Sequence, residues 1–270
     1  MLEQFKGLIN PHVIRRAPFR VFEILKPRWS NFFHVFRKQV TERIKNNQFV
    51  VEGEKSIKDF LSSDYILKKL FSTHPDDFNL HEKTVKISLS QLKQISFLKS
   101  PNKHLGVFEI KNKELKKNSQ YILLDSINDP GNLGAIIRSA EWFGFKQIIC
   151  SKNSVDCYNP KVVQASMGSL SRVDVIYTDL IKFIRNEKIP VFGTSTDGKS
   201  ILEFSKNINS GIWIFGSEAN GISDDISKLC ESFYSIPKSN KEILTESLNL
   251  STSVSLVMSY LKLFNKSLDL

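Results

Sequence analysis

Apolar residues fall in short runs along the second half of the chain, and polar segments with helical spacing separate these runs. Compact apolar runs are typical of buried strands, whereas apolar residues three or four positions apart are typical of helices. The pattern predicts strands at residues 121–124, 147–150, 173–177, 190–193, 211–215 and 232–235. Because helical segments alternate with these strands, we expect an α/β fold with a mostly parallel sheet covered on both faces.

The first half of the chain shows a shorter α/β pattern. It predicts strands at residues 48–51, 67–72, 85–88 and 106–110, with helices at 54–61 and 89–95. Residues 111–117 are polar and charged, as in a linker, and residues 1–35 are aromatic and basic. We therefore expect three regions, namely a basic lead-in at 1–35, a small α/β domain at 36–112 and a larger α/β domain at 118–270.

A glycine-containing turn lies between the strand expected at 121–124 and the helix that follows it. Residues 129–131, Asp-Pro-Gly, break the apolar pattern as a turn, in which proline fixes φ and glycine can take a positive φ. Asn132 and Arg138 project from this junction, and neither belongs to a buried apolar face. The junction would expose backbone N–H groups to a ligand, so it is a candidate site.

Two later segments combine strand ends with glycine, proline and polar side chains in a similar way. Residues 212–223, IWIFGSEANGIS, end an apolar run at a glycine and continue with a glutamate and a second glycine. Residues 235–255 combine a strand end, a proline turn and a Ser-Leu-Asn start of a helix. Each segment alone has an ordinary structural explanation, as a turn, a polar loop or a helix cap. These explanations do not account for the presence of all three segments at the ends of strands in one α/β pattern.

Together the three segments resemble the three sequence motifs of the TrmH (SpoU) family of the SPOUT superfamily, which are RNA ribose 2′-O-methyltransferases that use S-adenosylmethionine. The matching residues are Asp129, Pro130, Gly131, Asn132, Gly134, Arg138, Ala140 and Gly144 in the first motif, Gly216, Glu218 and Gly221 in the second, and Ile236, Pro237, Ser247, Leu248 and Asn249 in the third. Residues 49–61 also resemble the small α/β substrate-binding domain that often precedes these methyltransferases.

The resemblance implies a parallel sheet whose C-terminal segment forms a trefoil knot, a topology that sequence patterns alone do not predict. It also implies that S-adenosylmethionine is held mainly by backbone groups around Gly216, Ile236 and Leu248. Thr194 and Ser195 follow the strand expected at 190–193 and are close enough in this topology to line the cofactor. Residues 238–246 are longer than the corresponding family segment, so we expect the loop to bulge beside the cofactor.

The resemblance makes Arg138 the catalytic arginine. A guanidinium is a poor base, so we expect it to clamp the adjacent phosphate and to stabilise the developing oxyanion. Asn132 would fix Arg138 and the ribose, and Glu218 would hold the arginine or a ribose hydroxyl. Ser247 and Asn249 would complete this ring of hydrogen bonds. No metal is expected in the reaction.

Positive charge is concentrated in the half of the chain that lacks the three motifs. The chain has a formal net charge of +10. Residues 1–117 hold 23 Lys and Arg against 12 Asp and Glu, whereas residues 118–270 hold 15 against 16. This asymmetry suits a phosphate-binding domain beside a small-molecule catalytic domain. We expect RNA as the partner, and large-subunit ribosomal RNA rather than tRNA.

The remaining sequence features indicate neither a metal centre nor a membrane protein. The three cysteines (Cys150, Cys157 and Cys230) form no CxxC pair, which favours buried reduced thiols over a zinc site or a disulfide framework. The five histidines lack the spacing of metal ligands. Apolar runs stay well short of the ~18 residues of a membrane span, and we expect a cytoplasmic protein.

The C-terminal segment predicts a homodimer through the catalytic domain. Within residues 248–264, one helical stripe holds Leu250, Val254, Val257, Met258 and Leu261, and another face holds Leu256, Tyr260 and Leu263. A helix that is apolar over so much of its circumference needs a second surface besides its own sheet.

Three alternatives stay open at this point. The chain could methylate tRNA, or it could methylate a base in the manner of a more distant SPOUT relative. It could also be a catalytically silent RNA-binding or ribosome-assembly factor with the same fold. The presence of Asn132, Arg138, Glu218 and Asn249 disfavours the silent factor, because binding alone would not require all four.

Overall fold

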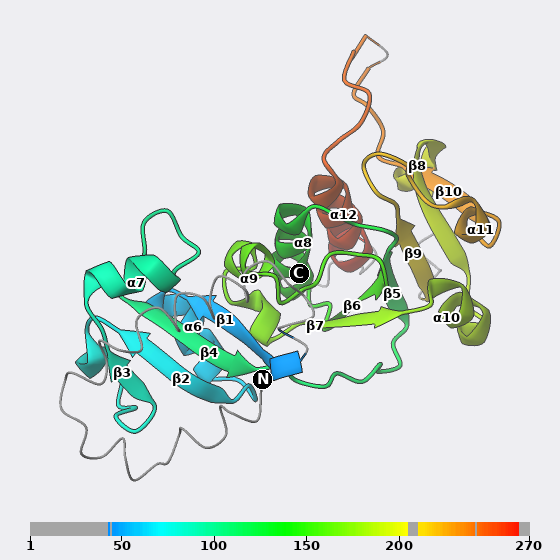
Figure 1. Ribbon diagram of the computed structural model, residues 1–270. Coiled ribbons are helices and arrows are strands. Elements are labelled where there is room, and N and C mark those ends of the chain that lie inside the picture. Colours follow the sequence, from blue (N-terminus) through cyan, green and yellow to red (C-terminus); the bar gives the residue numbers. More distant parts are fainter. Residues whose placement is uncertain (1–42, 44, 205–209, 241, 265–270) are drawn as a thin grey trace.

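The computed structural model describes residue 43 and residues 45–204, 210–240 and 242–264, which form two sheets with their helices (Figure 1). The lead-in expected at residues 1–35 lies outside the described residues. Within the described part of the chain, no helix is both long and apolar enough to cross a membrane.

The first sheet has four strands in the order β1-β4-β2-β3. Strand β4 is antiparallel to both of its neighbours, and β3 is parallel to β2. The strands and helices predicted here are confirmed, with small shifts at their ends. The elements are β1 (Gln48–Glu52), α6 (Glu54–Leu61), β2 (Leu67–Ser72), η1 (Pro75–Asp77), β3 (Thr84–Lys86), α7 (Leu89–Ile95) and β4 (His104–Glu109).

The second sheet has six strands in the order β10-β8-β9-β5-β6-β7, and every pairing is parallel. This confirms the predicted mostly parallel sheet. Its elements are β5 (Gln120–Leu124), α8 (Pro130–Trp142), β6 (Gln147–Ser151), α9 (Pro160–Ala165), η2 (Ser169–Ser171), β7 (Asp174–Thr178), α10 (Leu180–Glu187), β8 (Val191–Ser200), η3 (Ile201–Glu203), β9 (Gly211–Phe215), α11 (Asp224–Ser227), β10 (Ser232–Ser235) and α12 (Leu250–Ser259), followed by a π-helical turn at Tyr260–Phe264.

Helices cover both faces of the six-stranded sheet. Ile122 and Leu124 of β5 belong to the apolar core that contains α8, α9 and α12, whereas Tyr121 and Leu123 belong to the core that contains α10 and α11. Successive side chains of a strand point to opposite faces, so a strand buried on both sides reads as one continuous apolar run. This is why the strands were visible in the sequence as runs rather than as alternations.

The four-stranded sheet packs directly on the second domain through α9 and the turn before it (Figure 1). The rings of Phe49 and Tyr158 have centroids 4.5 Å apart, and the hydroxyls of Tyr65 and Tyr158 are 3.1 Å apart. Arg43, which is 2% exposed, donates two hydrogen bonds to Asp156 at 2.9 and 2.6 Å. The two sheets therefore share a core.

The segment between the two sheets is anchored at Lys113. The Lys113 side chain is only 5% exposed, and its ammonium lies 5.7 Å from the ring centres of both Tyr65 and Tyr158. The ammonium also lies 3.7 Å from a carboxylate oxygen of Asp174. A cation over aromatic faces is stabilised by the ring quadrupoles, more strongly when it is desolvated. Lys113 thus holds this segment against both domains, although the sequence around it reads as a linker.

The turn expected at residues 129–131 is in fact the start of a helix. Helix α8 begins at Pro130, and the Asp129 carboxylate accepts a hydrogen bond from the backbone N–H of Asn132 at 2.7 Å as its N-cap. Proline suits this first helical position because its missing N–H would have no partner there. Gly131 lies in the first helical turn and is not among the glycines with positive φ. Gly131 therefore does not use the positive φ that glycine allows.

The chain leaves the domain after β10 and returns at α12. Residues 237–240 and 242–249 are exposed, and this part of the chain stands out from the body of the molecule (Figure 1). The extra length noted in residues 238–246 therefore lies on the surface. The trefoil knot stays a prediction.

Candidate active site

The loops that follow β5, β9, β8 and β10 start at one edge of the sheet. These four strands are adjacent and parallel, so their carboxyl ends meet at the same edge. Ligands of open α/β sheets bind at this edge. All three sequence motifs lie in loops or helix starts beyond these strand ends, which brings together residues that are up to about 120 positions apart in the sequence.

Asn132 connects the first motif to the other two. Its side-chain amide donates a hydrogen bond to the Glu218 carboxylate, and its carbonyl oxygen accepts one from the Asn249 amide at 3.0 Å. Asn132 is half-buried in the first turn of α8, whereas Glu218 and Asn249 are exposed. The three polar side chains thus form a chain of hydrogen bonds with one side open to solvent.

Asn249 is held in place by the start of α12. As the N-cap of that helix, its side-chain oxygen Oδ1 accepts hydrogen bonds from the backbone N–H groups of Ser251 at 2.9 Å and Thr252 at 3.4 Å. Its amide group is therefore free to turn toward Asn132. Asn249 is thus both the N-cap of α12 and part of the candidate site, so the two interpretations of this residue do not exclude each other. Ser247, two residues earlier, is exposed.

Glu218 stands on a tight turn after β9. Ser217 and Gly221 exchange two backbone hydrogen bonds, at 3.0 and 2.8 Å, and Gly221 has a φ of +64°. A Cβ at Gly216 would overlap the backbone of Gly221. The second motif therefore needs its glycines for the shape of this turn.

Asp125 is a contributor that the sequence analysis missed. This carboxylate follows β5 directly, is 4% exposed, and accepts hydrogen bonds from the backbone N–H of Ser223 and the Ser126 hydroxyl, each at 2.9 Å. It thereby joins the loop of the first motif to that of the second. A carboxylate placed directly after a buried strand was the signal that could have revealed it.

Arg138 lies apart from the hydrogen-bonded chain. It is exposed on α8, and among the described residues no hydrogen bond or ion pair joins its guanidinium to Asn132 or Glu218. Its positive charge is therefore available to an anion from solvent. Arginine is well suited to this, because its planar fork binds phosphate oxygens in pairs.

The residues expected to hold the cofactor gather at the same sheet edge. Thr194 and Ser195 lie within β8, Gly216 follows β9 and Ile236 follows β10; all four are partly buried. The Thr194 hydroxyl donates a hydrogen bond to the Ile214 carbonyl at 2.9 Å, which ties β8 to β9 at this edge. Leu248 is nearly half exposed ahead of α12. Half-exposed backbone on adjacent strand ends, with glycine where a side chain would collide, fits a ligand bound through backbone groups.

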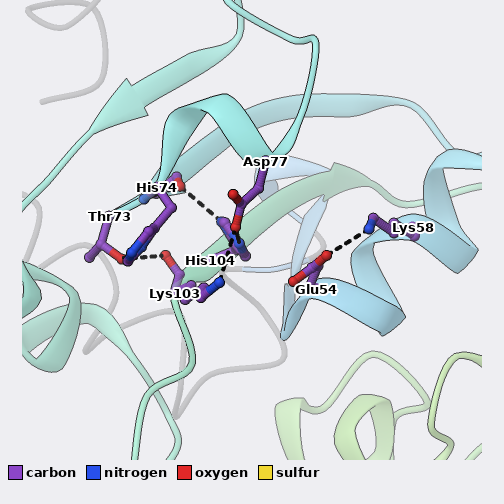
Figure 2. A network of polar contacts seen from close by, with 8 residues as sticks. Glu54, Lys58, Thr73, His74, Asp77, Lys103 and His104 are labelled. Carbon is purple, nitrogen blue, oxygen red and sulfur yellow. Dashed lines mark hydrogen bonds and ion pairs between the residues drawn. The ribbon is translucent and has the colours of Figure 1, made fainter.

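A second polar cluster lies far from these motifs, in the four-stranded sheet (Figure 2). Ligand atoms of Glu54, Asp77 and His104 lie within 4.8 Å of one another, a spacing a metal ion could use. Lys58 pairs with Glu54 at 2.6 Å, and Lys103 pairs with Asp77 at 3.3 Å. Both carboxylates thus have positive partners already, so we read the cluster as a structural network.

The cysteines carry free thiols, and burial raises the pKa of each of them. The pKa of Cys157 is raised to about 12 and that of Cys230 to about 11, and Cys150 is fully buried. Such thiols stay protonated near neutral pH and are poor nucleophiles. They are packing residues rather than part of a reactive site.

Comparison with known proteins gives the same assignment as the motifs. The SpoU rRNA Methylase family matches residues 119–259. The chain is 23% identical over 228 residues to the 23S rRNA (guanosine(2553)-2′-O)-methyltransferase RlmP of Bacillus subtilis, covering 82% of this chain and 91% of that protein. It is 28% identical over 169 residues to the 23S rRNA (guanosine-2′-O-)-methyltransferase RlmB of Neisseria meningitidis, covering 61% of this chain and 66% of that protein.

Among solved structures, a TrmH-family protein of Porphyromonas gingivalis superposes with a TM-score of 0.76 at 30% identity, covering 86% of this chain and 96% of that one. The likeness thus includes both sheets and is not restricted to the motif-bearing half. Together with the motifs at the sheet edge, these matches show that the chain belongs to the SpoU (TrmH) family and is an S-adenosylmethionine-dependent RNA 2′-O-methyltransferase.

Proposed function

We propose that this enzyme methylates a ribose 2′-hydroxyl of large-subunit ribosomal RNA, with the residues of the three motifs as its active site. The observation that carries the proposal is the hydrogen-bonded chain of Glu218, Asn132 and Asn249, which joins all three motifs at the ligand-binding edge of the sheet. The names of RlmP and RlmB, which act on 23S rRNA, support the choice of ribosomal RNA over tRNA.

The chemistry requires alignment and charge stabilisation more than proton abstraction. S-adenosylmethionine supplies an electrophilic methyl group when it is bound, and Thr194, Ser195, Gly216, Ile236 and Leu248 would hold it. The enzyme's task is to orient the ribose hydroxyl and to stabilise the negative charge that develops on its oxygen.

Arg138 is the group that we assign to this charge. Its exposed guanidinium can bind a phosphate next to the target ribose and stabilise the developing oxyanion, while the hydroxyl proton passes to phosphate or water. A guanidinium stays protonated in proteins and is a poor proton acceptor, which argues against direct abstraction.

Asn132, Glu218, Ser247 and Asn249 would orient the ribose. Asn132 already donates to Glu218 and accepts from Asn249, so Glu218 and Asn249 each keep hydrogen-bonding capacity on the exposed side of the site. A ribose offers hydroxyls that donate and accept. Ser247, exposed two residues ahead of Asn249, would complete the contacts.

The four-stranded sheet, within residues 36–112, would anchor the RNA. Its half of the sequence carries the whole excess of positive charge, which attracts phosphates over about a Debye length. We also propose a homodimer through α12 and a cytoplasmic location.

Mass spectrometry of cellular RNA tests the proposed substrate. Mass spectrometry of ribosomal RNA from cells with and without the gene should show the loss of one 2′-O-methyl group, and transfer RNA should be unchanged. A lost methyl group on tRNA would contradict the substrate, and a lost methyl group on a base would contradict the ribose chemistry. If neither RNA changes, the proposed ribosomal substrate is wrong.

Arg138→Ala tests the catalytic assignment. Removing a donor aimed at developing charge costs roughly 10²–10³ in rate, while cofactor affinity should hardly change. Transfer of labelled methyl groups to RNA and calorimetric cofactor binding are the measurements. Lys182→Ala, which removes an exposed cation from α10 on the other face of the sheet, is the matched control and should retain full activity. Residual activity of Arg138→Ala above about a tenth of the wild type would contradict the assignment.

A further inference from the structure

The loop that follows β6 is pinned against the loop of the first motif. The Ser151 hydroxyl accepts a hydrogen bond from the backbone N–H of Ser126 at 2.8 Å. The Ser154 hydroxyl accepts one from the backbone N–H of Ile127 at 3.1 Å. The Asn153 amide in turn donates to the Ser126 hydroxyl at 2.9 Å. The loop after β6 therefore has a fixed place beside the start of α8.

The same segment continues into the contact between the two domains. Asp156 accepts two hydrogen bonds from Arg43, and the Tyr158 ring packs on Phe49 of β1. Helix α9 follows directly and also contacts β1 (Figure 1). Residues 151–158 thus connect the first motif with the four-stranded sheet, which we propose to anchor the RNA. An RNA strand bound at both places would lie along this segment.

Carboxylates outnumber cations in the loops that surround the first two motifs. The loops at residues 125–129, 152–159 and 216–223 are all described, and they contain four acidic side chains and one basic side chain, Lys152. The four carboxylates, each of which accepts a hydrogen bond, are those of Asp125, Asp129, Asp156 and Glu218. Because like charges repel, an RNA strand that reaches Asn132 needs a cation that offsets these carboxylates.

Lys152 is available to be that cation. It is exposed in the turn after β6, and no described residue forms an ion pair or hydrogen bond with its ammonium. The backbone that carries it is fixed, because the neighbouring Asn153 is bonded to Ser126. A single exposed lysine is usually only solvated. Its place on a fixed loop between the four-stranded sheet and the first motif is what gives Lys152 a specific meaning.

We propose that Lys152 is a substrate-binding residue that holds a phosphate of the RNA strand between the four-stranded sheet and Asn132. The inference rests on the proposed RNA substrate. Lysine suits the role, because its compact ammonium on a flexible stem binds phosphate as a point charge. Lys152 would offset the carboxylates of the surrounding loops and leave Arg138 for the phosphate and the oxygen of the target ribose.

Three variants of the full chain separate charge from other roles of the side chain: Lys152→Ala, Lys152→Gln and Lys152→Arg. Filter binding of ribosomal RNA from cells that lack the gene is measured at several salt concentrations. In the Ala and Gln variants the log–log salt slope should fall by about 0.7–0.9, the loss of one phosphate contact. Their affinity should fall by roughly twofold to fivefold at low salt, and the difference should shrink as salt rises. Arg should retain both the slope and the affinity.

Methyl transfer and stability give the second set of readouts. In the Ala and Gln variants KM for RNA should rise by the same factor as the affinity falls, and kcat should hardly change. Calorimetric cofactor affinity and the urea unfolding midpoint should match the wild type, because the side chain is exposed.

Two control variants should keep the wild-type salt slope. Asn153→Ala changes the adjacent exposed residue and removes the hydrogen bond to Ser126 without removing a charge. Lys182→Ala removes an exposed lysine from α10 on the other face of the sheet.

Several results would overturn the proposal. An unchanged salt slope in Lys152→Ala would mean that the ammonium does not bind a phosphate, and a slope that Lys152→Arg also lowers would mean that charge is not what matters. A fall in kcat at constant KM, or a lower unfolding midpoint, would assign Lys152 to the structure of the loop. If the wild type methylates tRNA or no RNA, the proposed function fails first, and the salt slope for the RNA that the wild type binds still decides the role of Lys152. Binding of neither ribosomal RNA nor tRNA would overturn both proposals.

Discussion

At the level of single residues, the candidate site depends on how donors and acceptors are matched. Asn132 can serve Glu218 and Asn249 together because an amide both donates and accepts. A carboxylate or an ammonium at position 132 could do only one of these. This double role explains why position 132 holds an asparagine. From the sequence, we expected Asn132 to fix Arg138 instead.

Asn132→Asp should lower methyl transfer by roughly tenfold to a hundredfold, because it places a second carboxylate against Glu218 in place of a donor. Combining it with Glu218→Gln should restore much of the rate, since glutamine can then donate to the new aspartate. The measurement is methyl transfer to ribosomal RNA by the single and double variants. A double variant no better than Asn132→Asp would show that this contact is not what positions the site.

Some site residues were visible in the sequence and others were not, for a physical reason. Glycine, proline and Asn/Ser at strand ends stand out because each has few roles there. Asp125 was missed because one carboxylate after a strand has many ordinary explanations, and only its contact with the backbone of Ser223 shows its role. Gly131 was misread because Asp-Pro-Gly fits both a turn and a capped helix start, and the Asp129 cap decides between them.

At the level of secondary structure elements, the turn after β9 is a rigid support for Glu218. Its two backbone hydrogen bonds between Ser217 and Gly221 close the turn against Gly216. The Asp125 carboxylate then holds the far end of the loop through Ser223. The strands could be predicted from their apolar runs. The short distance between this turn and Asn132 could not, because it depends on the order of the strands in the sheet, which apolar runs do not specify.

Gly216→Ala should open this turn, because a Cβ there overlaps the backbone of Gly221. We expect cofactor affinity and methyl transfer to fall together by at least about tenfold, with a loss of unfolding free energy of about 1–3 kcal/mol. Calorimetric cofactor binding and urea unfolding are the measurements. Ala219→Ser, an exposed change in the same turn, is the control. Wild-type cofactor affinity in Gly216→Ala would contradict the placement of the cofactor beside this turn.

The start of β4 contains a buried titratable group that makes stability depend on pH. His104 is 0% exposed, with Nδ1 2.8 Å from the Ser72 hydroxyl and Nε2 3.2 Å from Asp77 (Figure 2). Burial lowers the pKa of His104 below its ordinary 6.5. The folded state therefore favours neutral imidazole. The stabilisation that comes from keeping His104 neutral is fully present above the pKa that histidine has in the unfolded chain. It is lost as the pH falls through the lower pKa of His104 in the folded protein.

The unfolding free energy should accordingly fall on acidification from about pH 7 to 5, with a slope of at most about 1.4 kcal/mol per pH unit from this one group. His104→Gln should flatten the dependence, although the variant is less stable at pH 7. His81→Gln, at an exposed histidine, should behave as the wild type. Urea unfolding at each pH is the measurement, and parallel pH profiles for wild type and His104→Gln would contradict the assignment.

At the level of the whole molecule, the two domains act as one packed unit. The sequence predicted two α/β domains joined by a charged linker. The excess of positive charge in the first half predicted that the first domain binds RNA and the second carries the chemistry. The packing of Tyr158 between the two domains could not be predicted, because the sequence of a loop does not indicate which residues its aromatic side chain contacts. Without the four-stranded sheet, the second domain would expose Tyr158, so we expect it to be less stable when isolated.

The outward surface of α12 is an exposed apolar region of the second domain. The stripe predicted to face the sheet is confirmed, with Leu250, Val254, Val257, Met258 and Leu261 buried. Leu256 and Leu263 are about half exposed. A groove of about 340 Å³ lies at Leu256 and is lined by Phe143, Ser251, Thr252, Ser255, Leu256 and Ser259. The groove extends along α12 from Ser251, next to the Asn249 cap, to Ser259, and includes Phe143 at the end of α8.

If a second copy covers this surface, the wild type should sediment as a dimer at about twice the 30.9 kDa of one chain. Leu256→Lys would place a charge in the centre of the apolar contact and should shift the protein toward monomer at micromolar concentration. Leu202→Lys, at a more exposed leucine on η3, is the control and should leave the dimer intact. Because the groove adjoins α8, the Leu256→Lys monomer should also lose methyl transfer while it keeps its fold. A wild-type mass near one chain, or a Leu256→Lys variant that remains dimeric, would contradict a dimer through α12.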